Sequence, residues 1–136
     1  MIKPAFSLPV RVYYEDTDAA GVVYYANYLR FLERARTEWL ASMGHPLAEL
    51  ERVHGIVFVV RRLEVDYRLP ARLSDALDVT VGIETLGHAS LTVQQQVLRS
   101  DRTLLNARVM LACVDRKRMK PVRIPITLKE RPESKR

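Results

Sequence analysis

The chain has 136 residues, of which 48% are apolar and 28% charged, a balance that fits one globular domain over residues 1–136 and excludes a disordered chain. Cys113 is the single cysteine, so an internal disulfide is excluded, in agreement with a reducing cytoplasm. No apolar run has the length of a signal peptide or of a membrane span.

The net charge of +6 is unevenly distributed along the chain. Residues 1–98 carry 10 basic and 12 acidic side chains, whereas residues 99–136 carry 12 basic and 4 acidic ones. A basic end of this kind suits the phosphates of a coenzyme, an anionic membrane surface, an acidic protein or nucleic acid, and it equally suits a solvated tail. Charge alone leaves these alternatives open. We expect a basic polar tail from about residue 125.

The predicted elements begin with a strand at residues 10–14, which is rich in β-branched and aromatic residues. An acidic loop follows, and from about Tyr25 apolar residues recur at helical spacing until Gly44 stops the helix. This central helix would be about 28 Å long, the width of a small domain. A short helix is expected at residues 45–53, ending at Gly55.

Four more strands are predicted at residues 56–69, 77–83, 91–97 and 105–113, separated by short turns. In the first of them we expect Val57, Val59 and Leu63 on one face, which Arg61 interrupts. The order predicts an α+β domain in which a curved antiparallel sheet of about five strands wraps around one long helix. Such a sheet has open edges, so we expect self-association.

The loop before the long helix carries Glu15, Asp16 and Asp18. Asp16 and Asp18 would point the same way in an extended chain, which is one arrangement for a metal pair. The histidines show no metal-ligand spacing, however, and there is no glycine-rich phosphate loop. For Glu15 and Asp16 we therefore prefer a structural role, in which they cap backbone N–H groups ahead of the helix.

Asp18 allows a chemical role as well as a capping one. The small residues after it, including Gly21, would let a substrate approach the backbone closely. Backbone N–H groups near Tyr24 and Tyr25, at the helix start, would then polarise a carbonyl as an oxyanion hole does. Asp18 would attack that carbonyl or activate a water molecule that does. From the residues alone, the catalytic role and the loop-capping role of Asp18 are equally well supported.

The segment VRVYYEDTDAAGVVYYANY at residues 10–28, followed by FLERARTEWL at residues 31–40, resembles the hotdog-fold acyl-CoA thioesterases. Within them it is similar to the bacterial Tol–Pal-associated group, related to 4-hydroxybenzoyl-CoA thioesterase. The similarity continues at FVV (residues 58–60), PARLSD (70–75) and ACVD (112–115), so that it covers nearly the whole chain.

The resemblance implies a hotdog fold, a dimer-based and often tetrameric assembly, and active sites at the subunit interface. It implies that Asp18, the second Asp of Asp-Thr-Asp, is catalytic as nucleophile or general base, with the helix N-terminus near Tyr25 polarising the carbonyl. The Tol–Pal group usually carries His at the position of Tyr25, whereas the hydroxybenzoyl enzyme carries Tyr. Either residue can polarise the carbonyl through its backbone N–H group, whereas a role of a histidine side chain is not available to Tyr25.

Substrate contacts are less specific in the sequence. We expect Gly21, Val23 and Tyr24 to lie against the acyl-CoA. The candidates for the coenzyme groove are two arginines of one strand, an arginine after Pro70, and two turn residues: Arg61, Arg62, Arg72, His88 and Ser90. Each of these five, taken singly, is equally an ordinary solvated residue.

The function that follows is acyl-CoA hydrolysis to free acid and coenzyme A. We expect no metal and no cofactor, since coenzyme A is part of the substrate. Thioesters of acyl carrier protein are a further candidate substrate. The expected location is the cytoplasm, with at most peripheral contact at the inner membrane and no specific nucleic acid. The alternative is a non-catalytic acyl-binding or scaffold protein of the cell envelope machinery.

Overall fold

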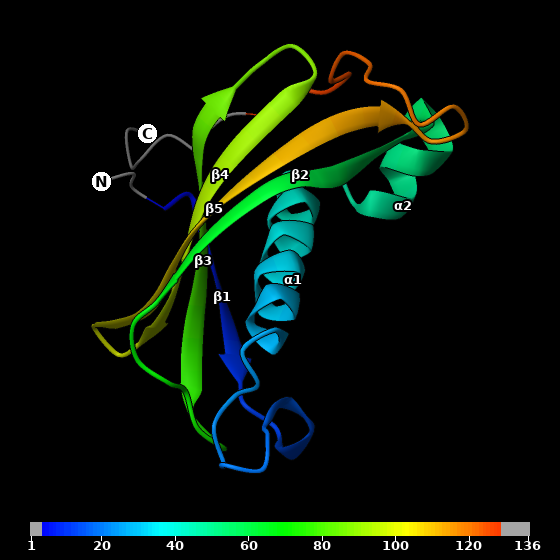
Figure 1. Ribbon diagram of the computed structural model, residues 1–136. Coiled ribbons are helices and arrows are strands. Elements are labelled where there is room, and N and C mark those ends of the chain that lie inside the picture. Colours follow the sequence, from blue (N-terminus) through cyan, green and yellow to red (C-terminus); the bar gives the residue numbers. More distant parts are fainter. Residues whose placement is uncertain (1–3, 129–136) are drawn as a thin grey trace.

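The computed structural model describes residues 4–128 (Figure 1). In chain order, the elements are β1 (Phe6–Arg11), a 3-10 turn (Tyr14–Asp16), α1 (Asn27–Ser42), α2 (Leu47–Glu49) with a π-helical turn (Leu50–His54), β2 (Ile56–Tyr67), β3 (Ala76–Leu86), β4 (Ser90–Arg99) and β5 (Arg102–Asp115). None of the helices in this part of the chain is long and apolar enough to cross a membrane.

The strands form one antiparallel sheet of five in the order β1-β3-β4-β5-β2. The sheet curves, and α1 lies against one of its faces (Figure 1). This arrangement confirms the predicted α+β class and the five-stranded sheet. β1 lies at residues 6–11 rather than 10–14, because it pairs along an edge with β3, where Pro9 removes no needed hydrogen bond.

α1 presents one apolar stripe to the sheet, and its buried residues are Tyr28, Phe31, Leu32, Ala35, Trp39 and Leu40. The helix stops as predicted, since Gly44 adopts φ +89°. It begins at Asn27 rather than near Tyr25, which shortens it to about 24 Å. The reason is a turn just before it, in which the Asn27 N–H donates to the Tyr24 carbonyl at 2.8 Å.

One buried amide ties the helix to the sheet. Gln95 on β4 is 1% exposed, and its side-chain N–H group donates to the carbonyls of Leu32 (3.0 Å) and Thr80 (3.2 Å). Its oxygen accepts from Arg36 at 3.1 Å. Both the nitrogen and the oxygen of the amide thereby have partners, so burial of this polar group is compensated. These hydrogen bonds of Gln95 fix the orientation of α1, and hence that of its N-terminal end, from within the core.

β2 differs from the prediction in its faces and in its burial. A β-bulge falls at Arg61, because Val60 pairs with Leu111 and Arg62 already pairs with Met110. The side chains facing α1 are therefore Phe58 and Val60 before the bulge and Leu63 after it. Thus Val57 and Val59 do not share a face with Leu63, and Arg61 does not interrupt an apolar face. β2 is an edge strand and is mostly exposed.

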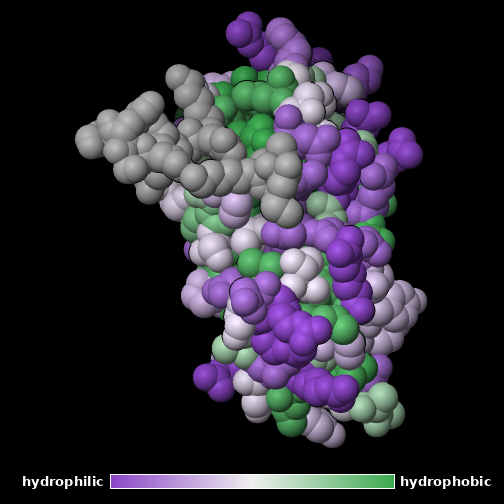
Figure 2. Space-filling model, turned by 90° about the vertical axis from the view of Figure 1, so that its left-hand side faces the viewer, coloured by the Kyte–Doolittle hydropathy of each residue, from purple (hydrophilic) through white to green (hydrophobic). Residues whose placement is uncertain are grey.

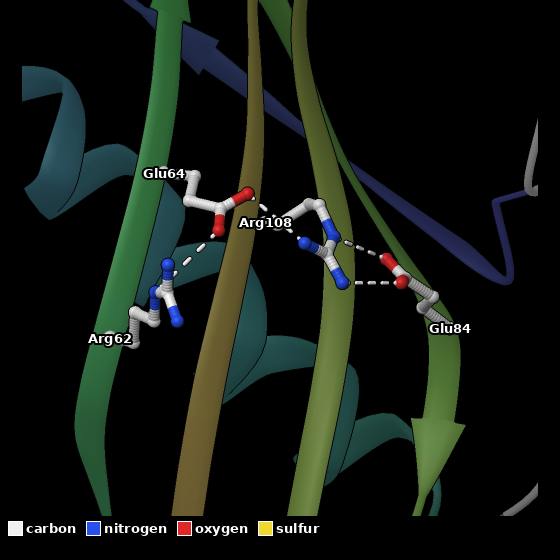
Figure 3. Close-up of polar contacts among 4 residues, drawn as sticks. All are labelled: Arg62, Glu64, Glu84 and Arg108. Carbon is white, nitrogen blue, oxygen red and sulfur yellow. Dashed lines mark hydrogen bonds and ion pairs between the residues drawn. The ribbon is translucent and has the colours of Figure 1, made fainter.

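The face of the sheet away from α1 is largely hydrophilic (Figure 2). On it, the Arg108 guanidinium makes two hydrogen bonds to Glu84, at 2.7 and 2.9 Å, and one to Glu64 at 3.0 Å (Figure 3). These carboxylates raise the pKa of Arg108 above its ordinary value. The network spans β2, β5 and β3 on the solvent side, and it includes Arg62, 3.6 Å from Glu64.

The segment after β5 packs back on the core. The Val122 N–H donates to Cys113 and the Ile124 N–H to His88, both at 2.9 Å, and Leu128 is buried. The predicted start of the tail, at about residue 125, falls inside this packed segment. Residues 129–136, the rest of the predicted tail, lie outside the described residues.

Candidate functional site

The loop between β1 and α1 closes into a tight hairpin with Asp18 at its base. Thr17 and Val23 form an antiparallel bridge, and the Asp18 N–H donates to the Val22 carbonyl at 2.9 Å. The Gly21 N–H donates to the Asp18 carbonyl at 3.0 Å, and Gly21 adopts φ +82°. An L side chain rarely adopts that backbone angle, so glycine is what permits this hairpin. The hairpin thus holds Asp18 and Gly21 close together, and the expected contact of Gly21 with substrate stays a prediction.

The Asp18 side chain is exposed, and one carboxylate oxygen accepts the Ala20 N–H at 2.8 Å. This is the loop-capping arrangement that the sequence also allowed. The second oxygen has no hydrogen-bond partner within residues 4–128. One oxygen therefore orients the carboxylate while the other faces solvent, an arrangement that serves a nucleophile or general base equally well.

Asp16 has a structural role, as predicted. It is 9% exposed, and its two oxygens accept the Tyr13 N–H at 2.8 Å and the Asn27 side-chain N–H at 2.9 Å. Because Tyr14–Asp16 is a 3-10 turn and not extended chain, Asp16 and Asp18 do not act as a pair. In the described part of the chain, no three His, Cys, Asp or Glu side chains are arranged to hold a metal ion.

The N–H groups without an acceptor in the turn before α1 differ from the predicted pair. The Tyr24 N–H donates to the Asp16 carbonyl at 3.0 Å, so it is not free to polarise a substrate. The N–H groups of Tyr25 and Ala26 have no acceptor within the described residues. The N–H groups left open at this helix start are thus those of Tyr25, which the prediction named, and of Ala26, which has no sequence signal.

Four aromatic rings cluster around this turn. Tyr25 lies 5.0 Å from Tyr24 and 6.4 Å from Tyr67, and Tyr67 lies 5.7 Å from Tyr28, measured between ring centroids. The Tyr67 hydroxyl donates to the Tyr25 carbonyl at 2.9 Å. Burial raises the pKa of Tyr28 and of Tyr67, so both hydroxyls stay protonated near neutral pH. Tyr67 is distant in sequence from the loop, and no motif marks it.

The connection between β2 and β3 packs against the Asp18 hairpin. Val22 bridges to Arg72, and the Val23 N–H donates to the Ala71 carbonyl at 2.9 Å. The Ala71 N–H in turn donates to the Tyr28 hydroxyl at 2.9 Å. The fold therefore brings Arg72 beside the Asp18 hairpin, as the prediction requires of a substrate-contacting residue.

Asp75 holds this connection in place. Its carboxylate accepts the Arg72 N–H at 2.9 Å and the Arg99 guanidinium at 2.7 Å. Burial by itself would raise the pKa of Asp75, but the Arg72 N–H and the Arg99 guanidinium outweigh it and hold the pKa below its ordinary value. Sequence analysis missed this residue, because a lone turn aspartate carries no functional signal.

Four of the predicted substrate residues lie away from Asp18 within one chain. His88 lies in the β3–β4 turn and Ser90 begins β4, at the opposite end of the sheet from the Asp18 hairpin (Figure 1). Arg61 is in the β2 bulge, and Arg62 joins the network on the outer face (Figure 3). A single chain thus does not gather all of the predicted site residues.

The best-formed pockets of the described residues lie away from the Asp18 hairpin. A pocket of about 440 Å³ opens on the outer face of the sheet, and its polar lining includes Gln94, Gln96, Asn106 and Arg108. A second pocket, of about 60 Å³, lies between α1 and the sheet and is lined by Trp39, among others. Neither contains a predicted site residue, and within one chain the Asp18 side chain is exposed and not enclosed.

Comparison with known proteins finds relatives that are described as thioesterases. A family model described as the thioesterase-like superfamily matches residues 12–131. The acyl-CoA thioesterase YbgC of Haemophilus influenzae is 44% identical over 129 residues, 95% of this chain and 95% of that protein. A solved structure of a probable thioesterase from Bartonella henselae is 36% identical, with TM-score 0.84 over 88% of this chain and 98% of its own. A 1,4-dihydroxy-2-naphthoyl-CoA thioesterase from Synechocystis is 25% identical, with TM-score 0.81 over 88% and 89%.

Proposed function

Because the chain belongs to the thioesterase-like superfamily, we propose that it hydrolyses acyl-CoA thioesters to a free acid and coenzyme A. The observation that carries the proposal is the similarity to the Haemophilus influenzae acyl-CoA thioesterase, which extends over 95% of both chains. The exposed carboxylate of Asp18 is close in sequence to two N–H groups at a helix start that have no acceptor among residues 4–128, and together they would supply the chemistry that thioester hydrolysis needs.

Two routes use Asp18. As a general base, its free oxygen takes a proton from water, the resulting hydroxide adds to the carbonyl carbon, and the C–S bond breaks. The leaving thiolate then takes the proton back from Asp18. As a nucleophile, Asp18 displaces the thiolate to form an anhydride, which water then hydrolyses. In both routes negative charge develops on the carbonyl oxygen, where the N–H groups of Tyr25 and Ala26 would stabilise it.

We propose that the working unit is a dimer formed along β2. This strand has a neighbour on one side only, and its inner face leaves Val60 and Leu63 49% and 37% exposed. An open edge with exposed apolar side chains favours pairing with a second strand. Antiparallel pairing about a two-fold axis would lay the Tyr67 end of one β2 beside the Ile56 end of the other.

This pairing would bring together predicted site residues that lie at opposite ends of the sheet within one chain. Ser90 pairs with Ala112, and Ala112 pairs with Val59 near the Ile56 end of β2. Two-fold pairing would therefore bring the His88–Ser90 turn of one chain toward the Asp18 hairpin of the other. The partner would supply a wall of the site and the predicted contacts to the coenzyme. A tetramer built from two such dimers is the larger assembly that we propose.

The finer assignments rest on the sequence resemblance and on surface charge. Acyl carrier protein as a substrate carrier, and peripheral contact with the inner membrane from the cytoplasmic side, are supported by the exposed basic residues after β5, which are Arg116, Lys117, Arg118, Lys120 and Arg123. Association with the Tol–Pal machinery, and kinship with the 4-hydroxybenzoyl enzyme, are supported by the loop motif alone.

The test of the proposed function is Asp18→Asn, assayed with short-chain, long-chain and aromatic acyl-CoA substrates. We expect kcat to fall at least about 100-fold, the usual contribution of a general base. The unfolding midpoint should stay unchanged, since asparagine still accepts the Ala20 N–H. Glu15→Gln, an exposed acid in the same loop, is the matched control and should keep wild-type rates. Wild-type kcat in Asp18→Asn would refute the role of Asp18.

A further inference from the structure

Tyr67 is the last residue of β2, and its side chain points toward the start of α1. Its hydroxyl donates to the Tyr25 carbonyl at 2.9 Å. Its ring packs edge-on against Tyr25 and Tyr28, with interplanar angles of 77° and 65°. The side chain is thus held by two rings while its polar end binds one specific backbone atom.

The geometry of the peptide unit links this hydrogen bond to a neighbouring donor. The Tyr25 carbonyl and the Ala26 N–H belong to one planar trans peptide and point in opposite directions. A hydrogen bond that fixes the carbonyl toward Tyr67 therefore fixes the Ala26 N–H away from Tyr67. The preceding peptide is held in the same way, since the Asn27 N–H donates to the Tyr24 carbonyl at 2.8 Å.

We propose that Tyr67 is a positioning residue, which holds the Tyr25–Ala26 peptide so that the Ala26 N–H joins the Tyr25 N–H in polarising the thioester carbonyl. This inference rests on the proposed acyl-CoA hydrolysis. Neither N–H has an acceptor among residues 4–128. Without the tyrosine hydroxyl this turn peptide is free to rotate, and the donor would have to be reoriented in each turnover.

The test is Tyr67→Phe, which removes the hydroxyl and keeps the ring that packs on Tyr25 and Tyr28. We expect kcat to fall about 10-fold, the effect of losing one ordinary hydrogen bond, with KM within about twofold of wild type. A donor that acts only in the transition state changes kcat and leaves substrate binding alone. The unfolding midpoint and the elution volume should match the wild type.

Tyr14→Phe is the matched control. Tyr14 is 82% exposed, and its hydroxyl has no hydrogen-bond partner in the described part of the chain, so its loss should leave kcat and KM unchanged. Wild-type kcat in Tyr67→Phe would overturn the positioning role. A raised KM with unchanged kcat would also overturn it, since Tyr67 would then bind substrate directly. Absence of hydrolysis by the wild-type protein would instead refute the proposed function, and this inference with it.

Discussion

At the scale of single residues, the loop before α1 contains two aspartates with different surroundings. Asp16 is buried, and both of its oxygens accept hydrogen bonds from the protein. Asp18 is exposed and uses one oxygen to cap its own turn. A carboxylate with both oxygens engaged is a structural element, whereas one with a free oxygen remains available to a substrate. The local backbone, and not the residue type, separates the two roles.

Asp16→Ala should destabilise the fold. It leaves the Tyr13 N–H and the Asn27 amide without an acceptor in a part-buried place, which we expect to lower the free energy of unfolding by about 1–3 kcal/mol. Urea denaturation measures this change. Glu15→Ala, an exposed neighbour, should change stability by less than about 0.5 kcal/mol. Equal stability of the two variants would contradict a structural role for Asp16.

At the scale of elements, the connection between β2 and β3 joins the hairpin, the helix and the sheet. Ala71 accepts from Val23 and donates to Tyr28, while Asp75 holds Arg72 and Arg99. Apart from the local bond between Asp75 and Arg72, these contacts cross between segments far apart in sequence. The hairpin that carries Asp18 therefore depends on a turn about fifty residues later for its position.

Asp75→Asn should make stability less dependent on pH. The pKa of Asp75 is lowered in the folded protein, so the carboxylate contributes stability that is fully present above its unfolded pKa of about 3.9 and is lost as pH falls through the folded value. We expect the variant to lose about 1 kcal/mol at pH 7. The difference from wild type should shrink below about pH 4.

Urea denaturation at pH 7 and at pH 3 measures this effect. The control is Asp101→Asn, in the exposed turn between β4 and β5, which should track the wild type at both pH values. A constant difference between Asp75→Asn and wild type at the two pH values would mean that the Asp75 charge does not stabilise the turn.

At the scale of the whole molecule, β2 is the open side of the sheet. Its outer face joins a charged network, while its inner face leaves apolar side chains exposed (Figure 3). The opposite edge, β1, is short and contains Pro9, which disfavours strand pairing. The asymmetry between the two edges makes β2 the edge that suits a second chain.

Leu63→Lys should weaken self-association. Leu63 is 37% exposed on the inner face of β2, where a lysine would place charge in the proposed interface. We expect a shift toward monomer in sedimentation velocity and a parallel loss of hydrolytic activity. Val53→Lys is the control, because Val53 is 54% exposed but lies in the π-helical turn outside β2. An unchanged assembly in Leu63→Lys would rule out pairing along β2.

The sequence by itself determined the class of the fold, the five strands, the long helix and its stop at Gly44. These follow from periodicity and turn chemistry, which act over a few neighbouring residues. The sequence also singled out Asp18, through a motif that is continuous in the chain. The structural role of Asp16 was equally readable, because capping is local.

Only the tertiary structure decided which donors face the site and which faces β2 presents. The Tyr24 N–H is occupied by the Asp16 carbonyl, and the bulge at Arg61 reverses the alternation of β2. Tyr67 contacts Tyr25, and Asp75 contacts Arg99, across long separations in sequence, so no local pattern marks these contacts. Hydrogen-bond partners and strand register depend on which segments of the chain come into contact in the folded protein. The pattern of residues adjacent in sequence does not specify those contacts.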